Sequence, residues 1–132
     1  MPTDDARPCR SFTTDSSFVK LACAGGVLVA RLAGPSIGQR EATIISRELS
    51  TALDAAGDRL RALVLDMRNV QMMASMGLGM CIDARNRASR GGAMTVVYGL
   101  CPELAQLFRV MKVDRLYRIA RNEAELSRVL AA

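Results

Sequence analysis

The sequence predicts an α/β domain with a mixed, largely parallel sheet of four to five strands that alternate with about four helices. Apolar runs of strand length at 63–67 and 94–98 are each followed by a segment in which apolar residues recur at helical spacing. Two further β-rich runs, 18–23 and 27–32, precede them. Because 50% of the 132 residues are hydrophobic, the chain can bury a core between the sheet and the helices that cover it.

The first predicted element is an antiparallel hairpin made of 18–23 and 27–32. Ala24-Gly25-Gly26 joins the two runs, and paired glycines supply the positive φ angles of a tight hairpin turn. Residues 1–17 mix Pro, Asp, Arg, Ser and Thr without apolar periodicity, so we expect a flexible lead-in. Residues 18–132 are predicted to form a single domain.

A helix is predicted from about Gln39 to Ala56. Glu41 lies in its first turn, where the helix dipole favours an anion, and Gly57 follows its end. The residues expected to face the core share one side of the helical wheel, and they are Ile45, Leu49, Ala52, Leu53 and Ala56.

The central strand, 63–67, leads through a loop into a second helix, which ends at Gly91-Gly92. Ser75 lies where a hydroxyl group caps a helix start, and Arg87 and Arg90 occupy the last turn. The residues expected to pack on the sheet are Leu78, Cys81, Ile82, Ala84 and Ala88.

The last third of the chain predicts a strand at 94–98, a helix that opens at Cys101-Pro102-Glu103, a short strand at 116–119 and a closing helix at 123–130. Proline is tolerated at an early helix position because its missing N–H would have no partner there. In the helix after Pro102, the residues expected to be buried are Leu104, Leu107, Phe108 and Met111.

Composition argues against an enzyme and favours a binding module. The chain has no histidine, no P-loop and no Cys-x-x-Cys pair, so we expect no catalytic residue, no metal site and no cofactor. The four cysteines are expected to be reduced and mostly buried. Asp66, at the end of the central strand, is the best single carboxylate, and a turn-stabilising or surface role is favoured over catalysis.

Charge gives a weaker indication about partners. The net charge is +5, but the arginines are scattered and aromatic residues are only 4%, so a dedicated nucleic-acid function is not expected. A basic surface suits an acidic protein partner better. No run approaches the ~20 apolar residues of a membrane span, and the polar, acidic start is unlike a signal peptide, so we expect a cytoplasmic protein with no membrane role.

Residues 63–79, Leu-Val-Leu-Asp-Met-Arg-Asn-Val-Gln-Met-Met-Ala-Ser-Met-Gly-Leu-Gly, resemble a STAS domain of the anti-sigma factor antagonist type. The family pattern there is an apolar strand ending in Leu-Asp, about seven residues, and then Asp-Ser-Ser-Gly-Leu-Gly at a helix start. The resemblance extends over roughly residues 18–130. It implies a STAS-like fold and a non-enzymatic switch that binds an anti-sigma factor, often a serine kinase of the GHKL ATPase type, and so frees a sigma factor.

In that family the kinase phosphorylates the second serine of the motif. Here the motif aspartate falls on Ala74, the first serine on Ser75 and the phosphoacceptor on Met76, whereas the Gly-Leu-Gly matches. Methionine cannot accept phosphate, so the resemblance implies a partner-binding site whose usual switch is absent. Ser75 is the one remaining hydroxyl of the loop; it is a candidate phosphorylation site, although a plain helix cap is favoured.

We therefore expect an unphosphorylated docking surface in the loop and helix start at residues 72–87. Met76 should be exposed because it lies on the polar side of the helix, whereas Met72, Met73 and Met80 are expected to fill the core. The predicted partner-binding residues are Ala74, Ser75, Met76, Gly77, Met80, Asp83 and Arg87.

Two other functions are left open by the sequence. The same surface could assemble copies of the chain or a larger regulatory complex, so the chain would be a structural subunit. A pocket beside the loop could instead hold a small ligand, but no glycine-rich phosphate cradle supports that alternative.

Overall fold

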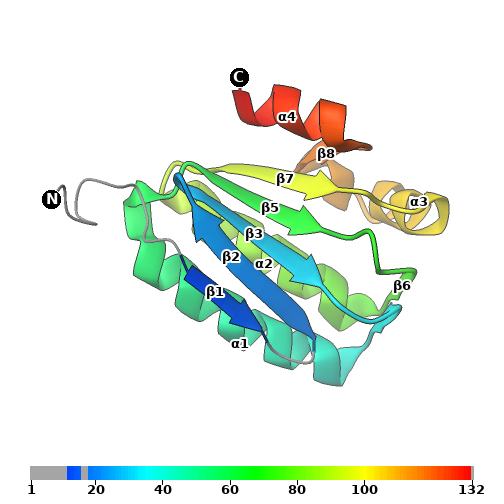
Figure 1. Cartoon of the computed structure of the whole chain (residues 1–132). Helices are drawn as coiled ribbons and strands as arrows, with labels where there is room; N and C mark the ends of the chain where they lie inside the picture. The colour runs from blue at the N-terminus through cyan, green and yellow to red at the C-terminus, as the bar shows by residue number, and fades with distance from the viewer. Residues whose placement is uncertain (1–11, 16–17, 132) are drawn as a thin grey trace, which may run out of the picture.

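A computed structural model describes residues 12–15 and 18–131, which fold into the predicted α/β architecture (Figure 1). In this part of the chain, six strands form one sheet in the order β1-β2-β3-β5-β7-β8. The first three strands are antiparallel neighbours, and β3, β5, β7 and β8 run parallel. The strands are β1 (Phe12–Asp15), β2 (Val19–Ala24), β3 (Val27–Leu32), β5 (Ala62–Asp66), β7 (Met94–Tyr98) and β8 (Arg118–Ala120).

Strand β1 lies in the segment for which the sequence predicts a flexible lead-in. Phe12–Asp15 pairs along the edge of β2, with Asp15 opposite Lys20, so the prediction is wrong for these four residues. A four-residue run with one apolar side chain has no alternation that would identify a strand, and its pairing depends on backbone groups. Residues 1–11 and 16–17 lie outside the described residues.

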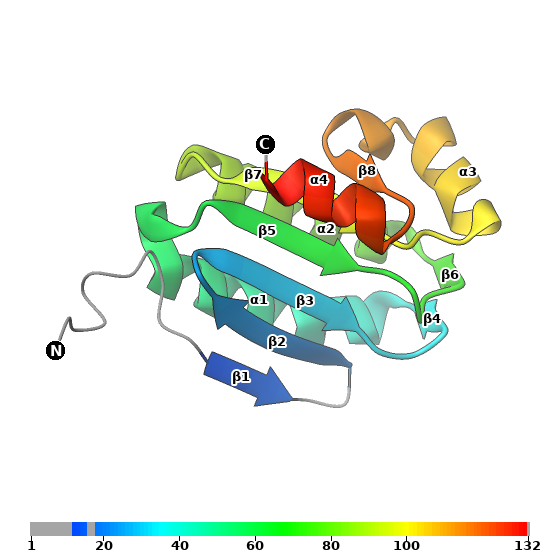
Figure 2. The same cartoon turned by 45° about the horizontal axis from the view of Figure 1, so that its top comes forward.

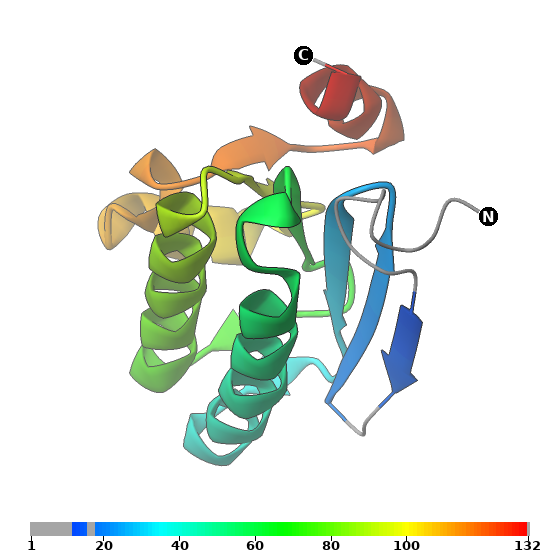
Figure 3. The same cartoon turned by 90° about the vertical axis from the view of Figure 1, so that its left-hand side faces the viewer.

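The helices cover the two faces of the sheet unequally. Helices α1 (Gln39–Ala56) and α2 (Ser75–Arg90) lie side by side on one face, and α4 (Glu123–Ala131) lies on the other (Figure 3). Figure 2 shows α4 in front of the half of the sheet that contains β5 and β7, with no helix in front of β1 and β2. Helix α3 (Pro102–Val110) follows β7. None of the described helices is long and apolar enough to cross a membrane.

Helix α1 forms with the bounds and the buried side that the sequence predicts. All five residues predicted to face the core are buried, the Glu41 carboxylate accepts a hydrogen bond from the Gly38 N–H at 2.9 Å, and Gly57 ends the helix with φ 59°. Every residue of β5 is buried, because this central strand has α1 and α2 on one side and α4 on the other.

Helix α2 buries four of the five residues predicted to pack on the sheet, namely Leu78, Cys81, Ala84 and Ala88. Ile82, expected on the sheet, is exposed, whereas Met80 is buried with Ala84 against Leu49 and Leu53 of α1. The cause is the neighbouring helix, because packing on α1 as well as on the sheet turns the buried side of α2 toward Met80.

Three smaller expectations also need correction. Met111 is exposed because α3 ends at Val110, before the apolar stripe would bury it. The last strand begins at Arg118, two residues later than predicted. Cys23 is disulfide-bonded, so the expectation of reduced thiols is wrong there, whereas Cys81 and Cys101 are free.

Candidate functional site

The loop between β5 and α2 is held by a small two-stranded sheet. Strand β6 (Met72–Met73) pairs in parallel with β4 (Ser36–Ile37), which precedes α1. The Pro35 carbonyl accepts hydrogen bonds from the N–H groups of Gln71 and Met72, and the Ile37 carbonyl accepts one from Ala74. These bonds fix the starts of α1 and α2 next to each other.

Ala74, not Ser75, is the N-cap residue of α2. Ser75 is the first helical residue, and no side chain caps the helix, so the predicted capping role of Ser75 is wrong. The Ala74 carbonyl accepts hydrogen bonds from Gly77 and Leu78 at 2.9 and 3.1 Å. Because alanine has no side-chain acceptor, the first backbone N–H groups of the helix lack an internal partner and leave a partial positive charge at its start. The Ser75 side chain is exposed.

Gly77 is required by close packing at this helix start. A Cβ atom added there would overlap the Met73 Cγ and lie 3.1 Å from the Met73 Sδ and 3.3 Å from the Ile37 Cγ2. Both neighbours are buried. Because Gly77 has no side chain, Met73 of β6 and Ile37 of β4 can pack directly against the backbone of α2.

The four methionines of residues 72–80 divide into two exposed and two buried side chains. Met76 is 49% exposed, as the sequence predicts, and Met73 is buried at 4%. Met72 is 62% exposed, so the expectation that it fills the core is wrong. Alternation along β6 explains this, because adjacent residues of a strand point to opposite sides. Met80 is 5% exposed and Gly77 is also buried, so both contribute little to the exposed part of the predicted docking surface.

A groove of about 400 Å³ runs between α1 and α2 beside Met76. Its α2 side carries both thioethers, of Met76 and Met80, and the carboxylate of Asp83. Its α1 side adds two hydroxyl groups, of Thr43 and Ser46, which no pattern in the sequence identifies as part of the site. The sequence shows that they lie off the buried stripe of α1, but it does not show which helix lies beside them. Among the described residues, the lining is Ala42, Thr43, Ser46, Met76, Gly79, Met80 and Asp83.

Arg87 links the two helices at the far end of the predicted docking surface. Its Nε donates to the Asp83 Oδ2 at 3.0 Å, and its Nη1 lies 3.6 Å from the Asp54 Oδ1 of α1. The hydrogen bond and negative charge of Asp83 raise the pKa of Arg87. Arg87 therefore remains a cation, and its two acidic neighbours offset that charge.

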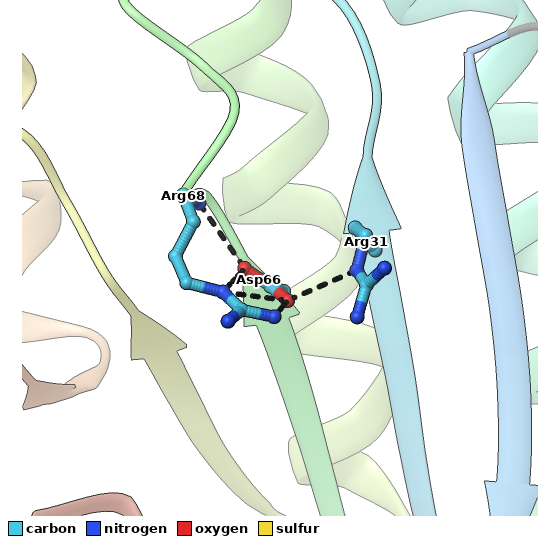
Figure 4. A network of polar contacts seen from close by, with 3 residues as sticks. All are labelled: Arg31, Asp66 and Arg68. Carbon is cyan, nitrogen blue, oxygen red and sulfur yellow. Dashed lines mark hydrogen bonds and ion pairs between the residues drawn. The ribbon is translucent and has the colours of Figure 1, made fainter. Parts of the chain in front are cut away.

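Asp66 holds the carboxyl end of β5 in place on the other side of the loop (Figure 4). It is 2% exposed and accepts hydrogen bonds from the Arg68 backbone N–H and the Arg68 and Arg31 guanidinium groups. Burial alone would raise the pKa of Asp66, but these bonds and the charge of Arg68 lower it below 3.8. The Arg68 guanidinium also lies 4.9 Å from the centre of the Tyr98 ring. This supports the turn-stabilising role expected for Asp66.

The described residues of the site form an exposed surface suited to binding. Within these ranges, no three His, Cys, Asp or Glu side chains come together as metal ligands do. What the site presents is an exposed thioether and hydroxyl at an uncapped helix start, with a shallow groove beside them.

Comparisons with known proteins agree on one fold. The STAS domain family model matches residues 19–126. The anti-sigma-factor antagonist (STAS) domain protein of Planctomyces limnophilus has a TM-score of 0.77 at 14% identity, with 86% of this chain and 98% of that chain covered. The phosphorylated form of the Bacillus cell fate determinant SpoIIAA has a TM-score of 0.65 at 18% identity, covering 84% and 98%.

A sulfate transporter family protein of Wolinella succinogenes also shares the fold, with a TM-score of 0.65 at 16% identity and coverage of 76% and 80%. No curated protein sequence matches the chain. Identities this low show a common fold alone.

Proposed function

Because the chain belongs to the STAS domain family, we propose that it is a non-enzymatic regulatory protein of the anti-sigma factor antagonist type. Its partner is an anti-sigma factor or a similar serine-kinase-like regulator, and its action is to control transcription by binding that partner. The contact is made through Ala74, Ser75 and Met76, with Asp83 and Arg87 at its far end. The docking works without the serine phosphorylation that the family uses.

The observation that carries this proposal is the exposed Met76 side chain at the start of α2. It occupies the motif position of the phosphoacceptor serine, is half exposed, and lines the groove between α1 and α2. A flexible, polarizable thioether suits contact with an apolar partner surface. An exposed apolar side chain here is compatible with a permanently docking-competent state.

Ser75 remains exposed beside Met76 and is the competing candidate for a switch. A phosphate at the first helical residue would be tolerated by the helix dipole, so the fold alone does not prevent it. We propose that Ser75 is not phosphorylated, because the family carries its phosphate at the next position, which here is Met76 and has no hydroxyl.

Binding to a serine-kinase-type anti-sigma factor from the same organism tests the docking surface. Met76→Asp places a carboxylate where relatives place phosphate and should weaken binding at least tenfold, because the charge loses its hydration in an apolar contact. Met111→Asp is the matched control, because Met111 is a methionine of similar exposure, 53%, that lies outside residues 72–87. It should bind like the unsubstituted protein. If Met76→Asp keeps the same affinity and the same circular dichroism spectrum, Met76 is not in the interface.

Incubation with that kinase and ATP tests the absence of the switch. The protein should gain no phosphate by mass spectrometry, and Met76→Ser should gain one. A phosphate on the unsubstituted protein that Ser75→Ala abolishes would show that Ser75 is the switch.

Self-association is the second candidate, and it is favoured by one observation. Val110 and Met111 form an exposed apolar pair at the end of α3, at 67% and 53% exposure. Light scattering over a range of concentrations separates the two functions, because a monomer at every concentration argues against assembly.

A further inference from the structure

We propose that Met76 is a site of reversible oxidation to methionine sulfoxide, and that this modification weakens docking in place of the missing phosphate. The effect on docking rests on the proposed function above. The oxidation itself does not, because it depends on the exposure of this thioether and on the environment of the helix start.

The chemistry needs a peroxide as the oxidant. The Met76 sulfur attacks one peroxide oxygen, the O–O bond breaks, an S=O bond forms, and the second oxygen leaves as water. Sulfur loses two electrons and the peroxide gains them. Methionine sulfoxide reductases reverse the step: two thiols become a disulfide, and the sulfoxide oxygen leaves as water.

Exposure limits oxidation in the methionine-rich segment to Met72 and Met76. Its side chain is half exposed, whereas Met80, which lines the same groove, and Met73, two residues before Ser75, are buried. Met67 is fully buried. An oxidant in solution therefore reaches Met76 and Met72 and leaves the three core methionines unchanged.

The helix start can accept the new oxygen without loss of the fold. Ala74 provides no side-chain acceptor, so the first N–H groups of α2 have no side-chain cap, and the positive end of the helix dipole lies within one turn of Met76. A sulfoxide oxygen carries partial negative charge, which this environment favours. Leu78 and Cys81, which hold α2 on the core, are untouched by the change.

The same oxygen opposes docking. In the reduced protein the Met76 thioether is an apolar group beside a groove in which Asp83 is the one charged residue among the described residues that line it. Oxidation replaces it with a strong hydrogen-bond acceptor, which must lose water when an apolar partner surface covers it. We expect roughly a tenfold to hundredfold loss of affinity.

Treatment of the full chain with hydrogen peroxide, followed by peptide mass spectrometry, tests the site. Met72, Met76 and Met111 should be oxidised well before Met67, Met73 and Met80, with an unchanged circular dichroism spectrum. Oxidation of Met80 at the same rate as Met76, or unfolding on oxidation of Met76, overturns the proposal.

Affinity for the serine-kinase-type anti-sigma factor, before and after peroxide, tests the consequence. The oxidised protein should bind more weakly and recover after treatment with the two sulfoxide reductases and dithiothreitol. Met76→Leu should keep its affinity through the peroxide step, whereas Met72→Leu and Met111→Leu should lose affinity as the unsubstituted protein does.

The outcomes separate the two proposals. If Met76→Asp weakens binding but the Met76 sulfoxide does not, the oxidation switch is wrong and the docking surface stands. If Met76→Asp leaves binding unchanged while peroxide still oxidises Met76 selectively and reversibly, the docking function fails and only the modification site remains.

Discussion

Two glycines in the first turns of α2 should respond to alanine with opposite signs. Gly77 lies over β4 and β6, and a Cβ atom there would overlap the Met73 Cγ. Gly79, two residues later, has nothing within 4 Å of the same atom. The pair therefore separates the effect of packing from the effect of helix propensity within one helix.

The magnitudes follow from these distances. At Gly77 the new methyl group would lie 3.1 Å from the Met73 Sδ and 3.3 Å from the Ile37 Cγ2, against about 3.5–4.0 Å for an ordinary contact. Overpacking of this kind lowers the free energy of unfolding by about 1–3 kcal/mol. The higher helix propensity of alanine raises it by up to ~1 kcal/mol. We expect Gly77→Ala to destabilise the fold by about 1–2 kcal/mol. Gly79→Ala should stabilise it by about 0.5–1 kcal/mol.

Urea unfolding measured by circular dichroism provides the free energies of unfolding of both variants and of the unsubstituted protein. The melting temperature should fall for Gly77→Ala and rise for Gly79→Ala, by roughly 3–5 °C for each kcal/mol of change in the free energy of unfolding. Stabilisation by both substitutions would refute the packing argument, because it would mean that Met73 and Ile37 move aside at no cost.

Leu78→Ala should lower the free energy of unfolding by about 2–4 kcal/mol and Met76→Ala by less than ~0.5 kcal/mol, because only the loss of the Leu78 side chain leaves a cavity in the core. Equal losses in urea unfolding would contradict the orientation of α2. Because the pKa of Asp66 is lower in the folded chain than its ordinary value of 3.8, its ion pairs stabilise the fold above about pH 4, and this stabilisation is lost as the pH falls through the folded pKa. Asp66→Asn should therefore remove part of the loss of stability in acid, measured as melting temperature against pH, and a curve parallel to that of the unsubstituted protein would argue against it. Burial raises the pKa of Cys81 to about 12, so iodoacetamide at pH 8 should label Cys101 in the folded protein and Cys81 only after unfolding. Labelling of Cys81 in the folded protein would show that α2 opens readily.

The sequence was sufficient to predict those elements whose buried residues follow a single regular pattern along the chain. The single apolar stripe of α1 and the continuous apolar run of β5 predicted both elements, because each pattern has one structural solution. The exposure of Met76 also followed from a helical wheel. The fold class followed from the order of these elements along the chain.

The details of the site depend on neighbours that no local pattern identifies. Ser75 is a better capping residue than Ala74, but the hydrogen bond from Ala74 to Ile37 starts the helix one residue earlier. Met72 and Met73 are chemically identical, and only the pairing of β6 with β4 decides which one is buried. The groove hydroxyl groups likewise depend on the packing of α1 against α2.

The pairing of β4 with β6 has a consequence for the evolution of loop length. Met72 faces Ser36 and Met73 faces Ile37 in this register. Because strand residues alternate in direction, deleting one residue from 67–71 would exchange the two methionines, placing Met73 in solvent and Met72 over Gly77. Relatives that lengthen or shorten this connection by one residue should therefore carry a compensating change on the segment before α1, whereas changes of two residues preserve the alternation and need none.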